Sequence, residues 1–257
     1  MTANPNDFRA TLKNGNSVLG LFMKTCDPAF VEIAGFAGFD FVILDMEHGP
    51  ASLETMQNHL RAAQTAGVLP VVRVSELDEV KIAQVLDIGA PCVQIPQIHN
   101  AQQAETAVRA AKYHPAGERG LCRFVRAANY SALWKSEYLD RANQVLVILQ
   151  LEGKPAIENI DDILTVEGID IIFIGPYDLS QSLGMPGEVT HPEVVKQMHF
   201  IADKAKTKGI VVGTFADSEE YAGKWLDTGI QYMAYSVDVA VFLQGCQQIV
   251  AKLSTKK

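Results

Sequence analysis

Four polar side chains that could take part in catalysis follow apolar runs that predict buried β-strands. The runs cover residues 39–44, 70–72, 145–151 and 170–174, and the polar residues that follow them are His48, Arg73, Glu152 and Asp178. Alternating strands and helices form a parallel sheet, and in such folds chemistry takes place at the rim where the carboxyl ends of the strands meet. The sequence therefore predicts that these four side chains share one site.

A candidate acid/base pair lies in the segment from Asp45 to Pro50. The segment holds three ionisable groups, Asp45, Glu47 and His48, within four positions. Alternate residues of a strand share a face, so Asp45 can orient His48 only if the chain turns at Glu47, and the following Gly49-Pro50 permits such a turn. A histidine oriented by an aspartate is a natural general base with a pKa near the working pH. The alternative is a loop histidine beside ordinary surface acids.

Glu152 and Asp178 predict a metal site, because they end two consecutive strands. Two carboxylates with open positions left over suit Mg²⁺ or Mn²⁺ better than Zn²⁺, which prefers His and Cys. Gly175-Pro176 exposes backbone N–H groups that can hold a carboxylate. Arg73 would place a fixed cation beside the metal, or form an internal ion pair with an acid of residues 45–47, and the two roles can coexist. The alternative for the two carboxylates is that both are solvated loop acids.

Composition indicates a globular chain with one large core and a small-molecule partner. The 257 residues, 48% of them apolar and 20% charged, can bury one large core. The net charge of −8, with Lys256-Lys257 as the one basic block, argues against binding to nucleic acid or to an anionic membrane surface. The four cysteines are far apart and form no CxxC pair, which indicates a reducing cytoplasm rather than a disulfide framework or zinc ribbon. We expect neither a signal peptide nor a membrane span, because residues 1–16 lack an apolar core and no apolar run approaches 18 residues.

Eight segments predict β-strands, and the segments between them show helical periodicity. The strands are expected at residues 17–23, 40–45, 70–74, 92–95, 145–151, 170–174, 210–214 and 232–236. Helices are expected at residues 52–66, 78–88, 101–112 and 192–208, the last beginning at Pro192. Val- and Ile-rich strands without strict alternation are typical of a barrel covered by helices. We therefore predict one domain, residues 1–257, folded as a single (β/α)8 barrel; a doubly wound open sheet is disfavoured because no Gly-rich fingerprint follows an early strand.

Other functions remain open at this level. A Schiff-base enzyme needs a lysine inside the barrel near a strand end, and Lys24 comes closest to that position. A non-catalytic barrel that binds carboxylates is the alternative outside enzymology. The polar loop 113–134 is long enough to predict a function of its own. The remaining histidines lack ligand spacing and are expected at the surface or an interface: His59, His99, His114, His191 and His199.

Several motifs together resemble the metal-dependent class II pyruvate aldolases, in order and over about residues 17–250. They are Leu44-Asp45-Met46-Glu47-His48-Gly49-Pro50, Pro70-Val71-Val72-Arg73, Leu86-Asp87-Ile88-Gly89-Ala90, Glu118-Arg119-Gly120, Leu149-Gln150-Leu151-Glu152, Ile174-Gly175-Pro176-Tyr177-Asp178-Leu179-Ser180 and Ser182-Leu183-Gly184. That family is typified by 4-hydroxy-2-oxoheptanedioate aldolase and the 2-keto-3-deoxy sugar-acid aldolases. The resemblance implies a (β/α)8 barrel whose last helix swaps between subunits of a homohexamer, and the apolar stretch 239–250 would serve that exchange.

The resemblance also implies roles for individual residues. These are the metal ligands Glu152 and Asp178, the acid/base dyad of His48 with Asp45, the enolate-stabilising cation Arg73, the holders of metal-bound water Gln150 and Glu47, and the carboxylate-binding segment from Gly175 through Pro176 and Tyr177 to Asp178. The implied cofactor is a divalent cation, Mg²⁺, Mn²⁺ or Co²⁺.

The implied reaction is the reversible cleavage of a 4-hydroxy-2-oxo acid, or of a 2-keto-3-deoxy sugar acid, to pyruvate and an aldehyde. Cleavage between C3 and C4 leaves the pyruvate enolate, whose negative charge must be stabilised as it forms. A divalent cation chelated by the 2-keto oxygen and the carboxylate acts as a Lewis acid, and Arg73 adds a preorganised charge. His48, directly or through water, removes the proton of the C4 hydroxyl.

Three features depart from the family pattern and bear on the second substrate. Tyr177 stands where the family commonly has Ala, and Phe215 stands near the aldehyde end where relatives often carry a smaller aliphatic residue. The segment 122–130 is unusually cationic and resembles a branch that includes a siderophore-pathway citrate synthase, which condenses rather than cleaves. Arg123 and Arg126 of this segment would grip a second carboxylate of the acceptor or would pair with nearby glutamates.

Overall fold

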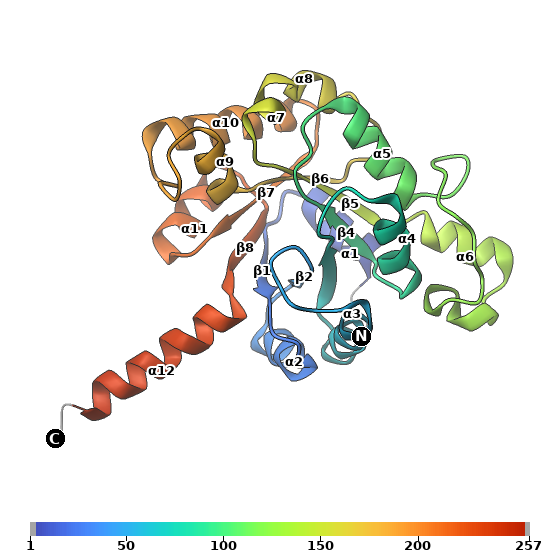
Figure 1. The fold of residues 1–257 in the computed structure, drawn as a ribbon, viewed down its shortest axis with the longest axis horizontal. Coiled ribbons are helices and arrows are strands. Elements are labelled where there is room, and N and C mark those ends of the chain that lie inside the picture. Colours follow the sequence, from blue (N-terminus) through green and yellow to red (C-terminus); the bar gives the residue numbers. More distant parts are fainter. Residues whose placement is uncertain (1–3, 255–257) are drawn as a thin grey trace.

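The structure is a computed structural model that describes residues 4–254. Its centre is a closed barrel of eight parallel strands in sequence order, in which β8 pairs with β1 (Figure 1). The strands are β1 (Val18–Met23), β2 (Phe41–Asp45), β3 (Leu69–Arg73), β4 (Cys92–Ile95), β5 (Leu146–Leu151), β6 (Ile171–Ile174), β7 (Val211–Ala216) and β8 (Tyr232–Val237). All eight predicted strands are present, so the predicted (β/α)8 barrel is confirmed.

Helices between successive strands surround the barrel, one further helix precedes β1 and one follows β8 (Figure 1). They are α1 (Pro5–Lys13), α2 (Pro28–Ala37), α3 (Leu53–Ala66), α4 (Glu79–Asp87), α5 (Ala101–Ala111), the 3₁₀ helix η1 (Arg126–Ser131), α6 (Lys135–Ala142), α7 (Lys154–Glu158), α8 (Ile160–Ile163), α9 (Pro176–Ser182), α10 (Pro192–Thr207), α11 (Glu219–Asp227) and α12 (Asp238–Ser254). The predicted start of α10 is confirmed, because it begins at Pro192 and His191 Nδ1 accepts a hydrogen bond from the Glu193 N–H at 3.2 Å.

The interior of the barrel is a packed aromatic core rather than a channel. Phe41 stacks on Tyr232 with ring centroids 4.0 Å apart, and Phe8 from α1 meets Phe41 edge to face at 5.8 Å. Gly20 makes room for this stack, because a Cβ there would lie 2.2 Å from the Phe41 ring. The helix α1 thus closes the amino ends of the strands with Phe8 and Leu12. This helix covers the amino ends of the strands, and chemistry in such barrels takes place at the carboxyl ends.

The expectation that His59 lies at the surface or at an interface is wrong, because this histidine is buried within the chain. It lies on α3 with an exposed fraction of 0%. Burial lowers the pKa of His59, although Asp238 and Asp27 oppose that shift. The helix periodicity of residues 52–66 places His59 one turn from Met56 and one turn from Ala63, both on the buried side, and this signal could have located it.

The last helix, α12, projects away from the barrel and ends at a distance from the other elements (Figure 1). Asp238 anchors its first turn, since its carboxylate accepts hydrogen bonds from the backbone N–H groups of Lys24 and Thr25 after β1. Large apolar side chains of α12 remain exposed: Val239, Val241, Phe242, Leu243, Ile249, Val250 and Leu253. None of the helices in the described part of the chain is long and apolar enough to cross a membrane.

Candidate functional site

The carboxyl ends of the strands surround a cavity of about 490 Å³. Its lining residues are Phe22, Lys24, His48, Arg73, Gln150, Phe173, Gly175, Pro176, Tyr177, Asp178, Phe215, Asp217, Ser236, Val237 and Ala240. Most residues singled out in the sequence are thus brought together, although they come from six different strand ends. Asp45 and Glu152 lie directly behind the lining, where they accept hydrogen bonds from Arg73 and Gln150.

A buried carboxylate, Asp45, organises the positive charge of the cavity. Arg73 donates from Nε and Nη2 to the two Asp45 oxygens, both at 2.8 Å, and Lys24 Nζ donates to Oδ2 at 2.9 Å. Burial disfavours the charge of Asp45, but the two cations outweigh burial and lower its pKa to about 2. Arg73 also pairs with Glu47 through Nη1 at 2.8 Å and lies 4.8 Å above the Phe22 ring. The ion pair predicted as one alternative for Arg73 therefore exists, and Arg73 lines the cavity as well.

The expected orientation of the His48 imidazole by Asp45 does not occur among the contacts of residues 4–254. The chain does turn at Glu47, and Asp45 Oδ1 accepts hydrogen bonds from the backbone N–H groups of Glu47 at 3.0 Å and His48 at 3.4 Å. The two carboxylate oxygens are otherwise taken by Arg73 and Lys24, which leaves Asp45 positioned to hold the loop and the cations rather than the imidazole. His48 is exposed and lines the cavity with its ring free of these contacts.

Glu152 is an almost fully buried carboxylate at the end of β5. Its Oε1 accepts from the backbone N–H of Gln97 at 2.9 Å, and its Oε2 accepts from the Gln150 side-chain amide. The Gln94 amide in turn donates to Gln150 Oε1 at 2.6 Å, which fixes the direction in which the Gln150 amide points. Burial, together with the nearby carboxylates of Asp178 and Glu47, raises the pKa of Glu152 to about 7.

The surplus of negative charge around Glu152 fits a divalent cation. Glu152, Asp178 and Glu47 repel one another, and burial also raises the pKa of Glu47. Gly175 allows the backbone after β6 to approach closely, because a Cβ there would lie 2.3 Å from Glu152 Oε2. No cluster of three His, Cys, Asp or Glu side chains suited to a metal ion occurs within residues 4–254. A site built on two carboxylates, with its remaining positions open to substrate and water, matches the ligand preferences of Mg²⁺ and Mn²⁺.

Two residues that line the cavity, Lys24 and Asp217, were not predicted as site residues from the sequence. One rule, the position directly after a strand, would have located both. Lys24 directly follows β1 and Asp217 directly follows β7, the same position relative to a strand that drew attention to Glu152. Asp217 accepts a short hydrogen bond from the Tyr177 hydroxyl. The Tyr177 and Phe215 rings lie 6.1 Å apart, so these three side chains form one wall of the cavity.

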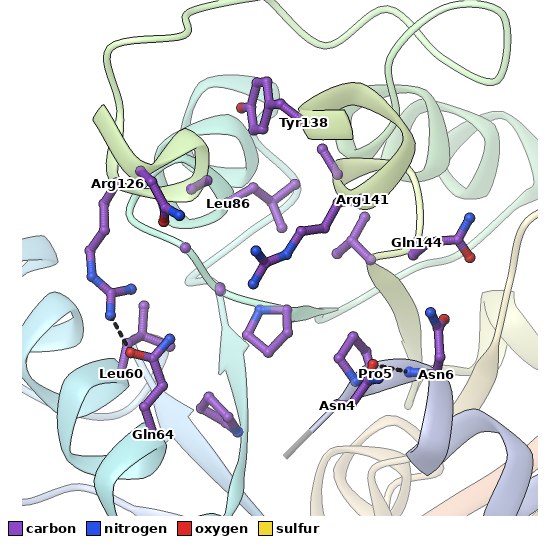
Figure 2. A pocket seen from close by; sticks show the side chains of 18 of the residues that line it. Asn4, Pro5, Asn6, Leu60, Gln64, Leu86, Arg126, Tyr138, Arg141 and Gln144 are labelled. Carbon is purple, nitrogen blue, oxygen red and sulfur yellow. Dashed lines mark hydrogen bonds between the residues drawn. The ribbon is translucent and has the colours of Figure 1, made fainter. Parts of the chain in front are cut away.

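Arg126 lies at the other end of the barrel, in a wider cavity of about 1320 Å³ (Figure 2). The wall of that cavity includes Pro70 at the start of β3 and Pro91 and Val145 just before β4 and β5, which places it at the amino ends of the strands. Arg126 donates to the Ile88 carbonyl at 2.9 Å and to Gln64 Oε1 at 2.6 Å. The expectation that Arg126 contacts the substrate of the same chain is therefore corrected: η1 packs against α4 and carries this arginine away from the carboxyl ends.

Comparison with known proteins identifies the family of the chain. Residues 18–245 match the family described as HpcH/HpaI aldolase/citrate lyase. A 4-hydroxy-2-oxo-heptane-1,7-dioate aldolase of Klebsiella pneumoniae is 34% identical over 97% of this chain and 94% of its own length. A hydroxypyruvate/pyruvate aldolase of Pseudomonas aeruginosa is 34% identical over 96% of this chain and 92% of its own. The crystal structure of an HpcH/HpaI family protein from Burkholderia cenocepacia is 31% identical, with a TM-score of 0.92 over 97% of this chain and 99% of that one. The chain therefore belongs to the HpcH/HpaI aldolase/citrate lyase family and is a carbon–carbon lyase.

Proposed function

We propose that the chain catalyses the reversible, divalent-metal-dependent cleavage of a 4-hydroxy-2-oxo acid to pyruvate and an aldehyde. The observation that carries this proposal is the convergence of three groups on one cavity: the buried Glu152 beside Asp178, the Arg73 guanidinium held by Asp45, and the uncommitted His48 imidazole. The aldolase names of the relatives support a small-molecule substrate of this class. A non-catalytic carboxylate-binding barrel would not need an uncommitted imidazole beside two ligand carboxylates.

The donor set of the cavity supports a cation held by Glu152 and Asp178. When bound there, Mg²⁺, Mn²⁺ or Co²⁺ would supply a Lewis acid for the carboxylate and keto oxygens of a 2-oxo acid. We assign to Gln150 and Glu47 the hydrogen bonding of water at the edge of this site. The backbone N–H groups of Tyr177 and Asp178 lie in the first turn of α9, where amides lack helical partners and can receive the substrate carboxylate.

The residues of the chain account for the charge and proton movements of the cleavage. Arg73 would stabilise negative charge on the 2-oxo oxygen without rearranging, because Asp45 and Glu47 already hold its guanidinium. In the cleavage direction His48 takes the proton of the C4 hydroxyl, the C3–C4 bond breaks, and its electron pair passes to the pyruvate enolate as the aldehyde leaves. A proton then returns to C3 and yields pyruvate. In the reverse direction the same groups remove a proton from the pyruvate methyl group.

Exchange of the pyruvate methyl protons with deuterium tests this proposal without a choice of aldehyde. We expect exchange, followed by NMR, with Mg²⁺, Mn²⁺ or Co²⁺ and its loss with EDTA. His48→Ala should slow exchange by about 10²- to 10⁴-fold, the usual contribution of a general base. His114→Gln, an exposed histidine outside the cavity, should exchange at the wild-type rate. Exchange that survives EDTA, with borohydride trapping of pyruvate on Lys24, would instead support a Schiff-base enzyme.

We also propose that α12 mediates assembly into a homo-oligomer, a hexamer by family resemblance. Seven large apolar side chains of this helix are exposed in the single chain, and apolar patches of this kind mark interfaces. The Phe242 side chain is 62% exposed in the single chain. Phe242→Asp should reduce the molar mass measured by size-exclusion chromatography with light scattering. Gln244→Asp adds the same charge to the same helix on the side opposite Phe242 and should leave the mass unchanged. An unchanged mass for Phe242→Asp would exclude this face as the interface.

A further inference from the structure

One wall of the cavity carries a polar pair of its own, Tyr177 and Asp217. Asp217 follows β7, Tyr177 lies in the first turn of α9, and the Tyr177 hydroxyl donates to Asp217 Oδ2. Both residues line the 490 Å³ cavity together with Phe215, whose ring lies 6.1 Å from that of Tyr177. Because both side chains line the cavity, they can contact the part of the substrate that extends beyond the pyruvate unit, which is the aldehyde half.

Asp217 keeps its negative charge uncompensated. The two cations that line the cavity are already paired, Lys24 with Asp45 and Arg73 with Asp45 and Glu47. No ion pair to Asp217 occurs within residues 4–254, and its partner there is the neutral Tyr177 hydroxyl. A carboxylate without a cation accepts hydrogen bonds from hydroxyl groups and repels a second carboxylate.

Tyr177 completes the pair as a permanent hydrogen-bond donor. The Tyr177 hydroxyl donates to Asp217 Oδ2, and a phenol carries its proton at neutral pH. Its hydrogen bond occupies one Asp217 oxygen and leaves the other free to accept. The aromatic rings of Tyr177 and Phe215 line the cavity beside Asp217.

We propose that Asp217 and Tyr177 form the subsite for the aldehyde half of the substrate and select short, uncharged, hydroxyl-bearing aldehydes over aldehydes that end in a carboxylate. This inference rests on the proposed retro-aldol function and adds to it the chemical class of the second product. A terminal hydroxyl would donate to the free Asp217 oxygen. A terminal carboxylate would be repelled by the Asp217 carboxylate. Neither Lys24 nor Arg73 would be free to pair with it, because both already pair with acids.

A matched pair of aldehydes tests the subsite in the direction of aldol addition. Glyceraldehyde and tartronate semialdehyde differ only in carrying CH₂OH or a carboxylate at the terminal carbon. With pyruvate and Mn²⁺, we expect the wild-type kcat/KM to favour glyceraldehyde by about tenfold, because the terminal carboxylate of tartronate semialdehyde would be repelled by the Asp217 carboxylate. Asp217→Asn should lower this ratio about tenfold, mainly by raising kcat/KM for tartronate semialdehyde. Tyr177→Phe should lower kcat/KM for glyceraldehyde, since Asp217 loses the donor that fixes it.

The controls separate failure of this subsite from failure of the proposed function. Glu219→Gln removes an exposed charge near Asp217 that does not line the cavity, and its ratio should equal that of the wild type. A wild-type ratio near one, or an unchanged ratio in Asp217→Asn, overturns the subsite while metal-dependent exchange of pyruvate methyl protons still supports the aldolase. Absence of that exchange in the wild type overturns both proposals.

Discussion

Arg73→Lys is expected to lower kcat/KM for retro-aldol cleavage by about 10²- to 10³-fold, the usual loss when one preorganised donor to a developing oxyanion is removed. The guanidinium donates through Nε and Nη2 to Asp45 and pairs through Nη1 with Glu47. A lysine ammonium is a point charge on a flexible stem and cannot reproduce this planar fork. It would therefore neutralise the two acids without holding a cation at the enolate oxygen.

The Arg73 substitution should also reveal its structural role. Arg73→Ala leaves the fully buried Asp45 with Lys24 as its one cation, and breaking a buried pair of this kind costs about 3–5 kcal/mol of unfolding free energy. Urea unfolding of wild type, Arg73→Lys and Arg73→Ala measures this cost. Arg109→Lys alters a solvent-exposed ion pair with Glu118 and should change stability by less than about 1 kcal/mol. Activity of Arg73→Lys within threefold of the wild type would exclude Arg73 from the reaction.

Glu152→Gln is expected to abolish metal-dependent activity and, without metal, to stabilise the protein. A glutamine cannot supply the charged oxygen that the proposed cation site needs, so exchange of pyruvate methyl protons should fall by more than about 10²-fold. In the metal-free protein, burial and the nearby carboxylates raise the pKa of Glu152 from its ordinary value of 4.5 to about 7. Ionising this group in the folded state is therefore unfavourable, and glutamine removes that penalty.

The sign of the effect follows from the two pKa values of Glu152. The folded state holds the proton of Glu152 more tightly than the unfolded state does. Ionisation of Glu152 therefore lowers the free energy of unfolding progressively as pH rises from about 4.5 to 7, and the full effect is reached above that range. The shift corresponds to about 3 kcal/mol at pH 8. With EDTA, the unfolding free energy of Glu152→Gln should thus exceed that of the wild type at pH 8, and the difference should vanish near pH 4.5.

Added metal should reverse the order of stability. A ligand that binds only the folded state raises the free energy of unfolding with the logarithm of the ratio of ligand concentration to Kd. Mn²⁺ should therefore stabilise the wild type but not Glu152→Gln. Glu158→Gln, an exposed glutamate on α7, should behave as the wild type at every pH and metal concentration. A wild type that Mn²⁺ does not stabilise would contradict Glu152 as a metal ligand.

Sequence alone was sufficient for the barrel and for the position of most cavity residues. Most strand residues are buried, and β2, β5 and β6 in particular appear as largely apolar runs that are visible without knowledge of their neighbours. Once eight such runs alternate with helices, residues just after each run must lie at one rim. This local rule placed Arg73, Glu152 and Asp178, and applied to β1 and β7 it would also have placed Lys24 and Asp217.

Only the tertiary structure decided which of these side chains contact one another. Closure of the barrel brings Arg73 and Lys24 to Asp45, so the carboxylate expected to orient His48 is occupied by cations from two other strands. The path of residues 113–134 likewise has no periodicity from which its direction could be deduced, and it carries Arg126 to the amino ends. The sequence by itself determined which residues occupy the rim, because strand burial is a local property. Their pairing, their pKa values and the Tyr177–Asp217 wall depend on contacts between distant segments, which local patterns do not encode.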